Sequence, residues 1–379
     1  MDILVNAFGI TDSGGLAVFD KLLGEISINT SHQCHIICNK SDGIDRLKIK
    51  YYPNSNIQFI LISNNGLLHR LYYENFSFRR LINNRNIQLI YNFSGSYQFF
   101  MKIPQIVKVQ NLLFFSKKLD SVYIQREQFV LWVKQVLLKR IIFKFMLSRS
   151  RYVDIQSKHV KSHLSDFINT EDKIFFIKSD IDISISSFHK PKQYDFSKKI
   201  KFLYIVGPHF EYVHKNFKDF TEAMTNLDKK GVDFEINITL TKNQLIKSKL
   251  WNNNLNSKTN FVGYVSDRHK MEELFCDNTV LISTSIIETL GLHVVEAIKS
   301  GIVVIAPDES YADAVYGENM VKYKLFNSDS LLNSIMNVIN DEKFDNKSIL
   351  FLQDDLKKSE MSKYANVLDI FDEVVSVQG

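Results

Sequence analysis

The stretch VLISTSIIETLGLHVVEAIKSGIVVIA, residues 280–306, contains a complete strand–loop–helix–strand pattern. Residues 280–282 are apolar and mostly β-branched, which predicts a strand, and a polar Ser/Thr loop follows them. Apolar residues then recur at helical spacing from near Leu290, and Gly301 is a typical helix stop. Residues 302–306 form an apolar run that predicts a buried parallel strand. Because open α/β sheets bind ligands at the carboxyl ends of their strands, this stretch predicts a ligand site.

The rest of the chain shows the same alternation of short apolar runs and segments with helical spacing, which favours an α/β fold with parallel, doubly wound sheets. A single helix is expected over residues 67–82. Residues 179–199 are polar and aperiodic, so the domain boundary is placed there. We therefore predict one domain over 1–188, a second over 189–360, and a C-terminal helix over 361–379 with the option of crossing back to the first domain. Strands are expected at residues 3–7, 35–38, 57–61, 87–91, 106–109, 152–156, 173–177, 201–206, 234–239, 259–262 and 320–323.

The composition is that of an ordinary globular protein, with 379 residues, 45% of them hydrophobic and 23% charged. No apolar run is long enough to cross a membrane, and the first ten residues lack the basic start of a signal peptide. We therefore expect a cytoplasmic protein. The net charge of +5 is too small to predict a nucleic-acid partner.

The three cysteines, Cys34, Cys38 and Cys276, are few and odd in number, which is typical of a reducing compartment. His32 and His35 lie close enough to the first two to suggest a metal site. This segment predicts a strand, however, and side chains on a strand alternate between its faces, so the four groups would not converge. We expect no metal site.

Residues 126–151 form a long apolar segment with basic residues and Glu127 as its only acid. One interpretation is a basic amphipathic helix at an anionic membrane surface, which would give the protein a peripheral position at the inner face of the cell membrane. The other is a core helix whose lysines extend outward to water. The sequence leaves both open. The basic residues are Lys134, Lys139, Arg140, Lys144, Arg149 and Arg151, and Trp132, Phe143 and Phe145 are the candidate interfacial aromatic residues.

Gly14 and Gly15 follow the first predicted strand and begin a helix. A glycine pair at such a turn lets the backbone approach a ligand closely, with free N–H groups at the helix start. An ordinary strand-to-helix turn is the alternative.

Several segments resemble the retaining glycosyltransferases of family 4. Glu288 and Glu296 have the E-x7-E spacing of that family, with Gly291 between them. Residues 300–307 are similar to its small-Gly strand, 261–267 to its F-x-G segment, and Gly207 with 214–217 to its donor loop. In the first half the similarity is weaker and rests on Gly14–Gly15, 109–111 and 154–157. The resemblance implies a GT-B architecture, in which two Rossmann-like, doubly wound domains face a central cleft.

The resemblance also implies roles for these residues. Glu288 and Lys215 would be the catalytic pair, with Lys215 on the donor phosphates and Glu288 on the hexose hydroxyls. Glu296 would accept hydrogen bonds from the ribose hydroxyls. The remaining donor-side residues would be Thr289, Leu290, Gly291, Leu292, Gly207, His209, Gly14 and Gly15, and the acceptor-side residues Ser94, Gln110 and Asn111. The family usually has an arginine after the donor-loop glycine, but here Pro208 and His209 follow Gly207. Either Lys215 works without that arginine, or His209, His214 or Arg268 substitutes for it.

The expected function is transfer of a hexose, with retention and without a metal or other cofactor, from a UDP-, GDP- or dTDP-sugar to a glycan hydroxyl. The expected acceptor is a lipid-linked oligosaccharide of surface-polysaccharide (O-antigen-like) synthesis. A non-catalytic GT-B homologue that binds sugar nucleotide and a sugar-nucleotide epimerase are the alternatives.

Overall fold

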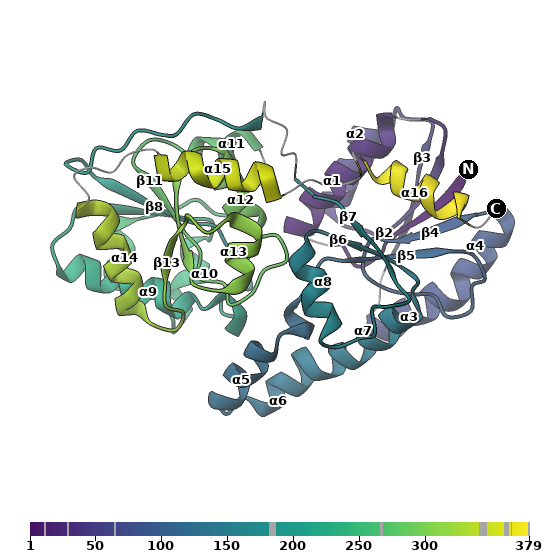
Figure 1. Ribbon diagram of the computed structural model, residues 1–379, viewed down its shortest axis with the longest axis horizontal. Helices are drawn as coiled ribbons and strands as arrows, with labels where there is room; N and C mark the ends of the chain where they lie inside the picture. Colours follow the sequence, from purple (N-terminus) through teal and green to yellow (C-terminus); the bar gives the residue numbers. More distant parts are fainter. Residues whose placement is uncertain are drawn as a thin grey trace. The chain divides into compact units, whose positions relative to one another are not determined.

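The computed structural model describes residues 1–10, 13–28, 30–63, 66–181, 187–265, 268–340, 347–359, 364 and 366–377. The chain forms two compact units (Figure 1). Unit 1 contains Met1–Phe115, Val133–Ile181 and Ser362–Gly379, and unit 2 contains Ser116–Trp132 and Asp182–Met361.

Unit 1 is built on a seven-stranded parallel sheet with the order β3-β2-β1-β4-β5-β6-β7. The chain moves from β1 outward to β3, returns to β4 beside β1, and then moves outward in the other direction. The switch point of the sheet therefore lies between β1 and β4. The strands are β1 (Asp2–Ala7), β2 (Gln33–Asn39), β3 (Ile57–Ile62), β4 (Leu89–Asn92), β5 (Gln105–Val109), β6 (Tyr152–Ile155) and β7 (Ile174–Ile177).

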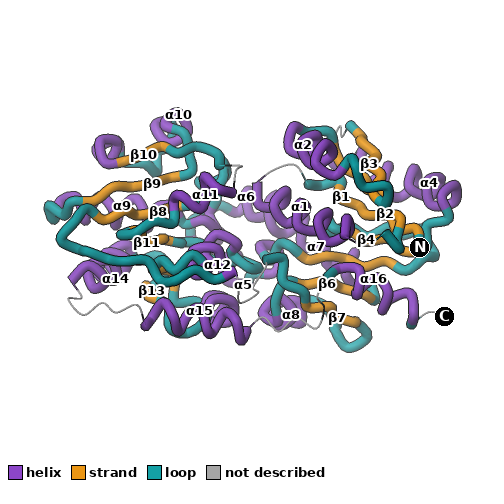
Figure 2. Tube along the Cα trace, turned by 90° about the horizontal axis from the view of Figure 1, so that it is seen from above, coloured by secondary structure: helices purple, strands orange, loops and turns teal. Residues whose placement is uncertain are grey.

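The helices of unit 1 lie on both faces of this sheet (Figures 1 and 2). Helices α1 and α2 cover one face, where α16 packs against α1, and α3, α4, α7 and α8 cover the other (Figure 1). The helices are α1 (Ser13–Ile28), α2 (Asp42–Tyr51), α3 (Leu67–Tyr72), α4 (Phe78–Arg85), α7 (Leu138–Arg149), α8 (Lys158–Ser165) and α16 (Val367–Ser376), with a 3-10 turn at Leu113–Phe115.

Two expected helices differ from the observed ones. The helix predicted over 67–82 is divided by a π-helical turn, Tyr73–Ser77, between α3 and α4. The basic segment is not one helix either: α5 (Lys117–Gln125) ends before it, and the chain then runs through α6 (Phe129–Trp132) and a second π-helical turn, Val133–Leu137, into α7. Such turns insert a residue into the helical ladder, and apolar periodicity alone does not reveal them.

Unit 2 has a six-stranded parallel sheet with the order β10-β9-β8-β11-β12-β13, so its switch point lies between β8 and β11. Its strands are β8 (Ile200–Tyr204), β9 (Phe234–Ile238), β10 (Thr259–Phe261), β11 (Thr279–Ile282), β12 (Val303–Pro307) and β13 (Val321–Tyr323). Besides α5 and α6, its helices are α9 (Phe217–Lys229), α10 (Lys242–Ile246), α11 (Arg268–Leu274), α12 (Leu292–Lys299), α13 (Ser310–Tyr316), α14 (Ser328–Asn340) and α15 (Lys347–Ser359), with 3-10 turns at Val213–Lys215 and Asn253–Lys258.

Residues Ser116–Trp132 belong to unit 2, whereas the sequence prediction placed them in the first domain. Within unit 2, Lys118 forms an ion pair with Glu309, and the Arg126 guanidinium lies 5.7 Å from the ring centroid of Phe326. These contacts join residues nearly two hundred positions apart, so local sequence patterns carry no sign of them.

A buried charge cluster lies in the core of unit 1. One of its members, Asp180, belongs to residues 179–199, which were predicted to be a polar domain boundary. The Lys108 ammonium lies 3.0 Å from a carboxylate oxygen of Asp154 and 2.8 Å from one of Asp180. Burial alone would lower the pKa of Lys108, but the two carboxylates raise it above its usual value. Asp180 also accepts a hydrogen bond from Gln156 at 2.5 Å. Residues 178–181 are therefore part of the core rather than of an exposed linker.

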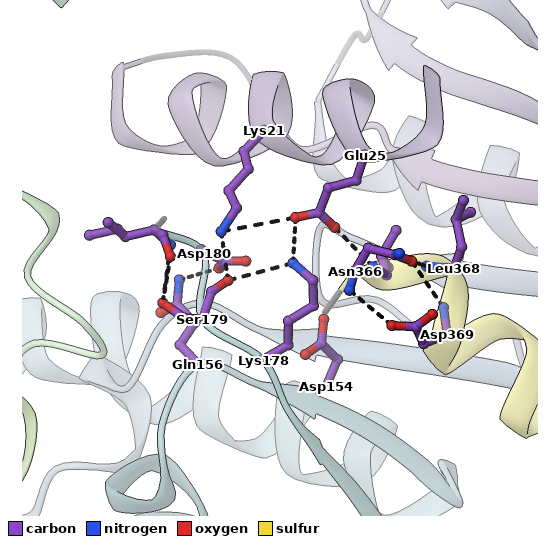
Figure 3. Close-up of polar contacts among 12 residues, drawn as sticks. Lys21, Glu25, Asp154, Gln156, Lys178, Ser179, Asp180, Asn366, Leu368 and Asp369 are labelled. Atoms are coloured by element: carbon purple, nitrogen blue, oxygen red, sulfur yellow. Dashed lines mark hydrogen bonds and ion pairs between the residues drawn. The ribbon is translucent and has the colours of Figure 1, made fainter. Parts of the chain in front are cut away.

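Figure 3 shows how α16 is held on unit 1 by neighbouring polar groups. Asn366 caps the helix and Asp369 completes a capping box. The Val367 amide donates to Glu25 of α1 at 2.9 Å, and the second carboxylate oxygen of Glu25 lies 2.7 Å from the Lys178 ammonium. Glu25 therefore links α1, the end of β7 and the start of α16.

Candidate functional site

The candidate site lies in unit 2, at the switch point of its sheet. The loop after β8 runs from Ile205 to Lys215 and contains Gly207, and the loop after β11 runs from Ser283 to Gly291. Because β8 and β11 are hydrogen-bonded neighbours, both loops leave the same edge of the sheet. This is where an open α/β sheet offers a ligand crevice.

The structure brings the two predicted catalytic residues together. The Lys215 ammonium lies 2.8 Å from a carboxylate oxygen of Glu288, and the two side chains are 26% and 17% exposed. Burial alone would raise the pKa of Glu288, but the Lys215 charge outweighs it and lowers that pKa to about 2. Glu288 is therefore ionised at neutral pH.

Backbone contacts fix this pair by joining the two loops. The Ile286 amide donates to the His214 carbonyl at 2.8 Å. The Thr284 hydroxyl donates to the Lys215 carbonyl at 2.7 Å, and the buried Tyr204 hydroxyl lies 2.7 Å from Thr284. The sequence prediction missed Thr284 and Tyr204 because neither has a charge or a motif.

Helix α12 begins directly after Glu288. Thr289 and Leu290 lead into Gly291, which has a φ of +57° and is the N-cap residue, and Leu292 is the first helical residue. A side chain at position 291 would overlap the Tyr316 hydroxyl and lie 2.9 Å from Tyr316 Cζ. The first turn of a helix directs its backbone N–H groups outward, so this start can receive an anion.

Two histidines next to the ion pair are uncharged at neutral pH. Burial lowers the pKa of His293 to about 4, and its ring Nε2 lies 3.3 Å from the Ser283 hydroxyl. Burial and the Lys215 charge lower the pKa of His214 to about 3. His214 therefore does not supply the positive charge of the arginine that this loop lacks.

The other predicted donor-side residues lie further from the pair. Glu296 is exposed on α12, about one turn after the helix start. Gly207 follows β8, and His209 is exposed and stacks on Tyr212 with ring centroids 4.8 Å apart. The Arg268 side chain lies outside the described residues.

The predicted residues of the first half lie in unit 1. Gly14 and Gly15 are in the first turn of α1. Gln110 and Asn111 follow β5, where the Asn111 side chain accepts a hydrogen bond from the Leu113 amide at 2.8 Å. Ser94 follows β4, and its hydroxyl accepts a hydrogen bond from Arg70 at 3.1 Å. The sequence prediction placed Arg70 on a helix but gave it no role.

Residues 187–350 match the family described as Glycosyl transferases group 1. The matched segment contains both loops of the candidate site. No curated protein sequence matches the chain.

Solved structures with the same architecture show the fold to be GT-B, with two Rossmann-like units. Sucrose-phosphate synthase from Thermosynechococcus elongatus is similar with a TM-score of 0.68 at 15% identity, over 100% of this chain and 97% of the other. HepE from Anabaena, solved with UDP and glucose, gives 0.62 at 15% identity, over 100% and 99%. The lipopolysaccharide outer core galactosyltransferase WaaB gives 0.61 at 14% identity, over 100% of both chains.

We predict that Gly291→Ala lowers the free energy of unfolding by about 3 kcal/mol, because it adds a steric overlap to the strain of a left-handed residue. Gly231→Ala is the matched control: Gly231 has a φ of +75° with nothing within 4 Å of an added Cβ, so only the strain of about 1 kcal/mol applies. Urea unfolding of both variants measures the difference. Equal losses would show that Tyr316 does not constrain the helix start.

Proposed function

We propose that the protein is a retaining glycosyltransferase that moves a hexose from a nucleotide sugar to a hydroxyl group of a glycan acceptor. The observation that supports it most is the Lys215–Glu288 ion pair beside the start of α12. This pair lies inside the segment that matches the group 1 glycosyltransferases. The solved structure of HepE, a protein of similar fold, contains UDP and glucose.

Each residue of the pair suits one part of such a donor. Transfer breaks the bond between the sugar and the diphosphate, so negative charge grows on the leaving group. Lys215 and the backbone N–H groups at the start of α12 would stabilise that charge, and on this proposal no metal ion is needed. A lysine ammonium has several N–H donors, so Lys215 can keep Glu288 while it contacts phosphate.

Glu288 would accept hydrogen bonds from the hexose hydroxyls, and Glu296 from the vicinal hydroxyls of the ribose. We propose a lipid-linked oligosaccharide of surface-polysaccharide synthesis as the acceptor. Among proteins of similar fold, WaaB is named for lipopolysaccharide galactosyl transfer. An epimerase would release nucleotide diphosphate without any acceptor, and a non-catalytic homologue would bind donor without turnover.

We predict that one UDP-, GDP- or dTDP-sugar raises the melting temperature of the protein by about 5 °C at a hundredfold excess over its Kd, whereas CMP-sugars do not. Glu296→Gln removes hydrogen bonds to the ribose and weakens donor binding about tenfold or more. A thermal-shift screen followed by calorimetric titration measures both effects.

Glu222→Gln is the control for this experiment, because Glu222 is exposed on α9 of the same unit and is part of neither loop. It should leave donor affinity unchanged. A flat response of the wild type to every donor would contradict the proposal.

We also propose that α7 places the protein at the inner face of an anionic membrane. Within unit 1, α7 exposes both apolar and basic side chains along its length. Such a surface suits lipid chains and anionic headgroups together. The exposed apolar residues are Leu138, Ile141, Ile142 and Phe145, and the exposed basic residues are Lys139, Lys144 and Arg149. In the described part of the chain, no helix is long and apolar enough to span a membrane.

Three residues from the predicted interfacial set face the protein instead. Arg140 donates to the Phe114 carbonyl and lies over the Phe167 ring. Phe143 stacks on Phe114 with ring centroids 5.0 Å apart, and the Trp132 indole donates to Asp120 at 2.7 Å. They are therefore left out of the membrane surface.

We predict that neutralising Lys139, Lys144 and Arg149 with glutamine weakens binding to anionic vesicles roughly a hundredfold, since each basic residue near the surface contributes about 1 kcal/mol. Co-sedimentation with neutral vesicles and with vesicles containing an anionic lipid measures this. The matched control neutralises the exposed Lys40, Arg46 and Lys102 and should bind as the wild type does. Equal losses in both triple variants would refute a specific surface on α7.

A further inference from the structure

A polar cluster lies at the switch point of unit 1, between the carboxyl ends of β1 and β4. Asn6 lies next to the last residue of β1, Asn92 is the last residue of β4, and both side chains are fully buried. The Asn6 side-chain amide donates to Asn92 at 3.2 Å and to the Ser96 hydroxyl at 2.8 Å. Open α/β sheets bind ligands at such a point. This cluster provides the polar side chains of unit 1 at its switch point.

Glu74 is the centre of this cluster. It lies in the π-helical turn after α3 and is 1% exposed. One of its carboxylate oxygens accepts hydrogen bonds from Asn6 at 2.9 Å, from Ser96 at 3.0 Å and from Arg70 at 3.0 Å. A buried carboxylate is costly unless a cation and hydrogen bonds compensate for it, and Arg70 supplies the cation.

Arg70 is held in one orientation but is not enclosed. Its Nε donates to Glu74, and one Nη donates to the Ser94 hydroxyl at 3.1 Å. The other Nη lies 2.6 Å from the position that a Cβ would take on the exposed Gly9, so a side chain there would displace the guanidinium. That nitrogen has no hydrogen-bond partner among the residues that the structure describes. The Arg70 side chain is 22% exposed.

We propose that Arg70 binds an anionic group of the acceptor, a phosphate or a carboxylate, at the switch point of unit 1. A guanidinium fixed through Nε and one Nη presents its remaining N–H groups in a planar arrangement that matches two oxygens of such a group. Glu74, Asn6 and Ser96 keep the guanidinium in place and do not touch the ligand. The assignment of this anionic group to the acceptor rests on the proposed function, whereas the anion site itself does not.

The alternative is an ion pair with a purely structural role. Arg70→Lys separates the two, because lysine keeps the charge that Glu74 needs but loses the planar donor pair. Arg79→Lys is the matched control: Arg79 is exposed on α4, the helix that follows the same π-helical turn.

The experiment titrates glucose 1-phosphate, glucuronate and glucose into the full-length wild type, Arg70→Lys, Arg79→Lys and Lys215→Met, by calorimetry. We expect the wild type to bind at least one of the two anionic sugars more tightly than glucose. Arg70→Lys should weaken that binding about tenfold with little change in melting temperature, whereas Arg79→Lys should bind as the wild type does. The anionic probe that binds more tightly identifies the group as phosphate or carboxylate.

Lys215→Met separates this site from the donor site. Binding that persists in Lys215→Met and is lost in Arg70→Lys supports the site in unit 1. Binding that is lost only in Lys215→Met places the anion in unit 2 and overturns the inference, while the proposed function stands. A change of melting temperature in Arg70→Lys without a change in affinity, or no anion binding at all, also overturns it.

Discussion

The ion pair between Lys215 and Glu288 joins the two loops that leave the carboxyl ends of β8 and β11. Either charge alone would be unfavourable in this largely buried position, so each stabilises the other there. The hydrogen bonds from Ile286 to His214 and from Thr284 to Lys215 connect the same two loops. Unit 2 therefore fixes its lysine and the start of α12 relative to each other before a ligand binds, which is the preorganisation that charge stabilisation requires.

Both units hold a cation near the switch point of their sheet, but with different residues. In each, a cation near the switch point of the sheet is held by a carboxylate: Lys215 by Glu288 in unit 2, and Arg70 by Glu74 in unit 1. Glu288 is partly exposed and can itself contact a ligand. Glu74 is buried, accepts hydrogen bonds from Asn6 and Ser96, and only orients its arginine. The carboxylate of unit 2 is therefore suited to substrate contact and that of unit 1 to positioning.

The sequence predicted what depends on local pattern. The strand, helix and strand of residues 280–306 were expected from apolar spacing, and β11, α12 and β12 are found there. The GT-B fold expected from the resemblance is confirmed by the solved structures of similar architecture. Lys215 and Glu288 were named together because both lie in motifs, and the ion pair joins them across 73 positions.

What the sequence did not predict depends on contacts between distant residues. Arg70 and Glu74 look like an ordinary i, i+4 pair on a helix surface, and only the fold brings Asn6 and Ser96 to them. Asp180 looks like part of a polar linker until Lys108 is placed beside it. The charge state of His214 depends on burial, so a histidine that the sequence offered as a substitute for arginine is uncharged in the fold.

The titration of Glu288 tests the central role of the ion pair most directly. Carbon-13 spectra of protein labelled at its glutamate carboxyls, with Glu288→Gln to assign the signal, follow this one group. We predict that Glu288 stays ionised down to about pH 3.5 in the wild type, and that in Lys215→Met its pKa rises above the usual glutamate range. If Glu288 titrates near its usual pKa in the wild type, or if Lys215→Met leaves its pKa unchanged, the ion pair does not control the charge of this site.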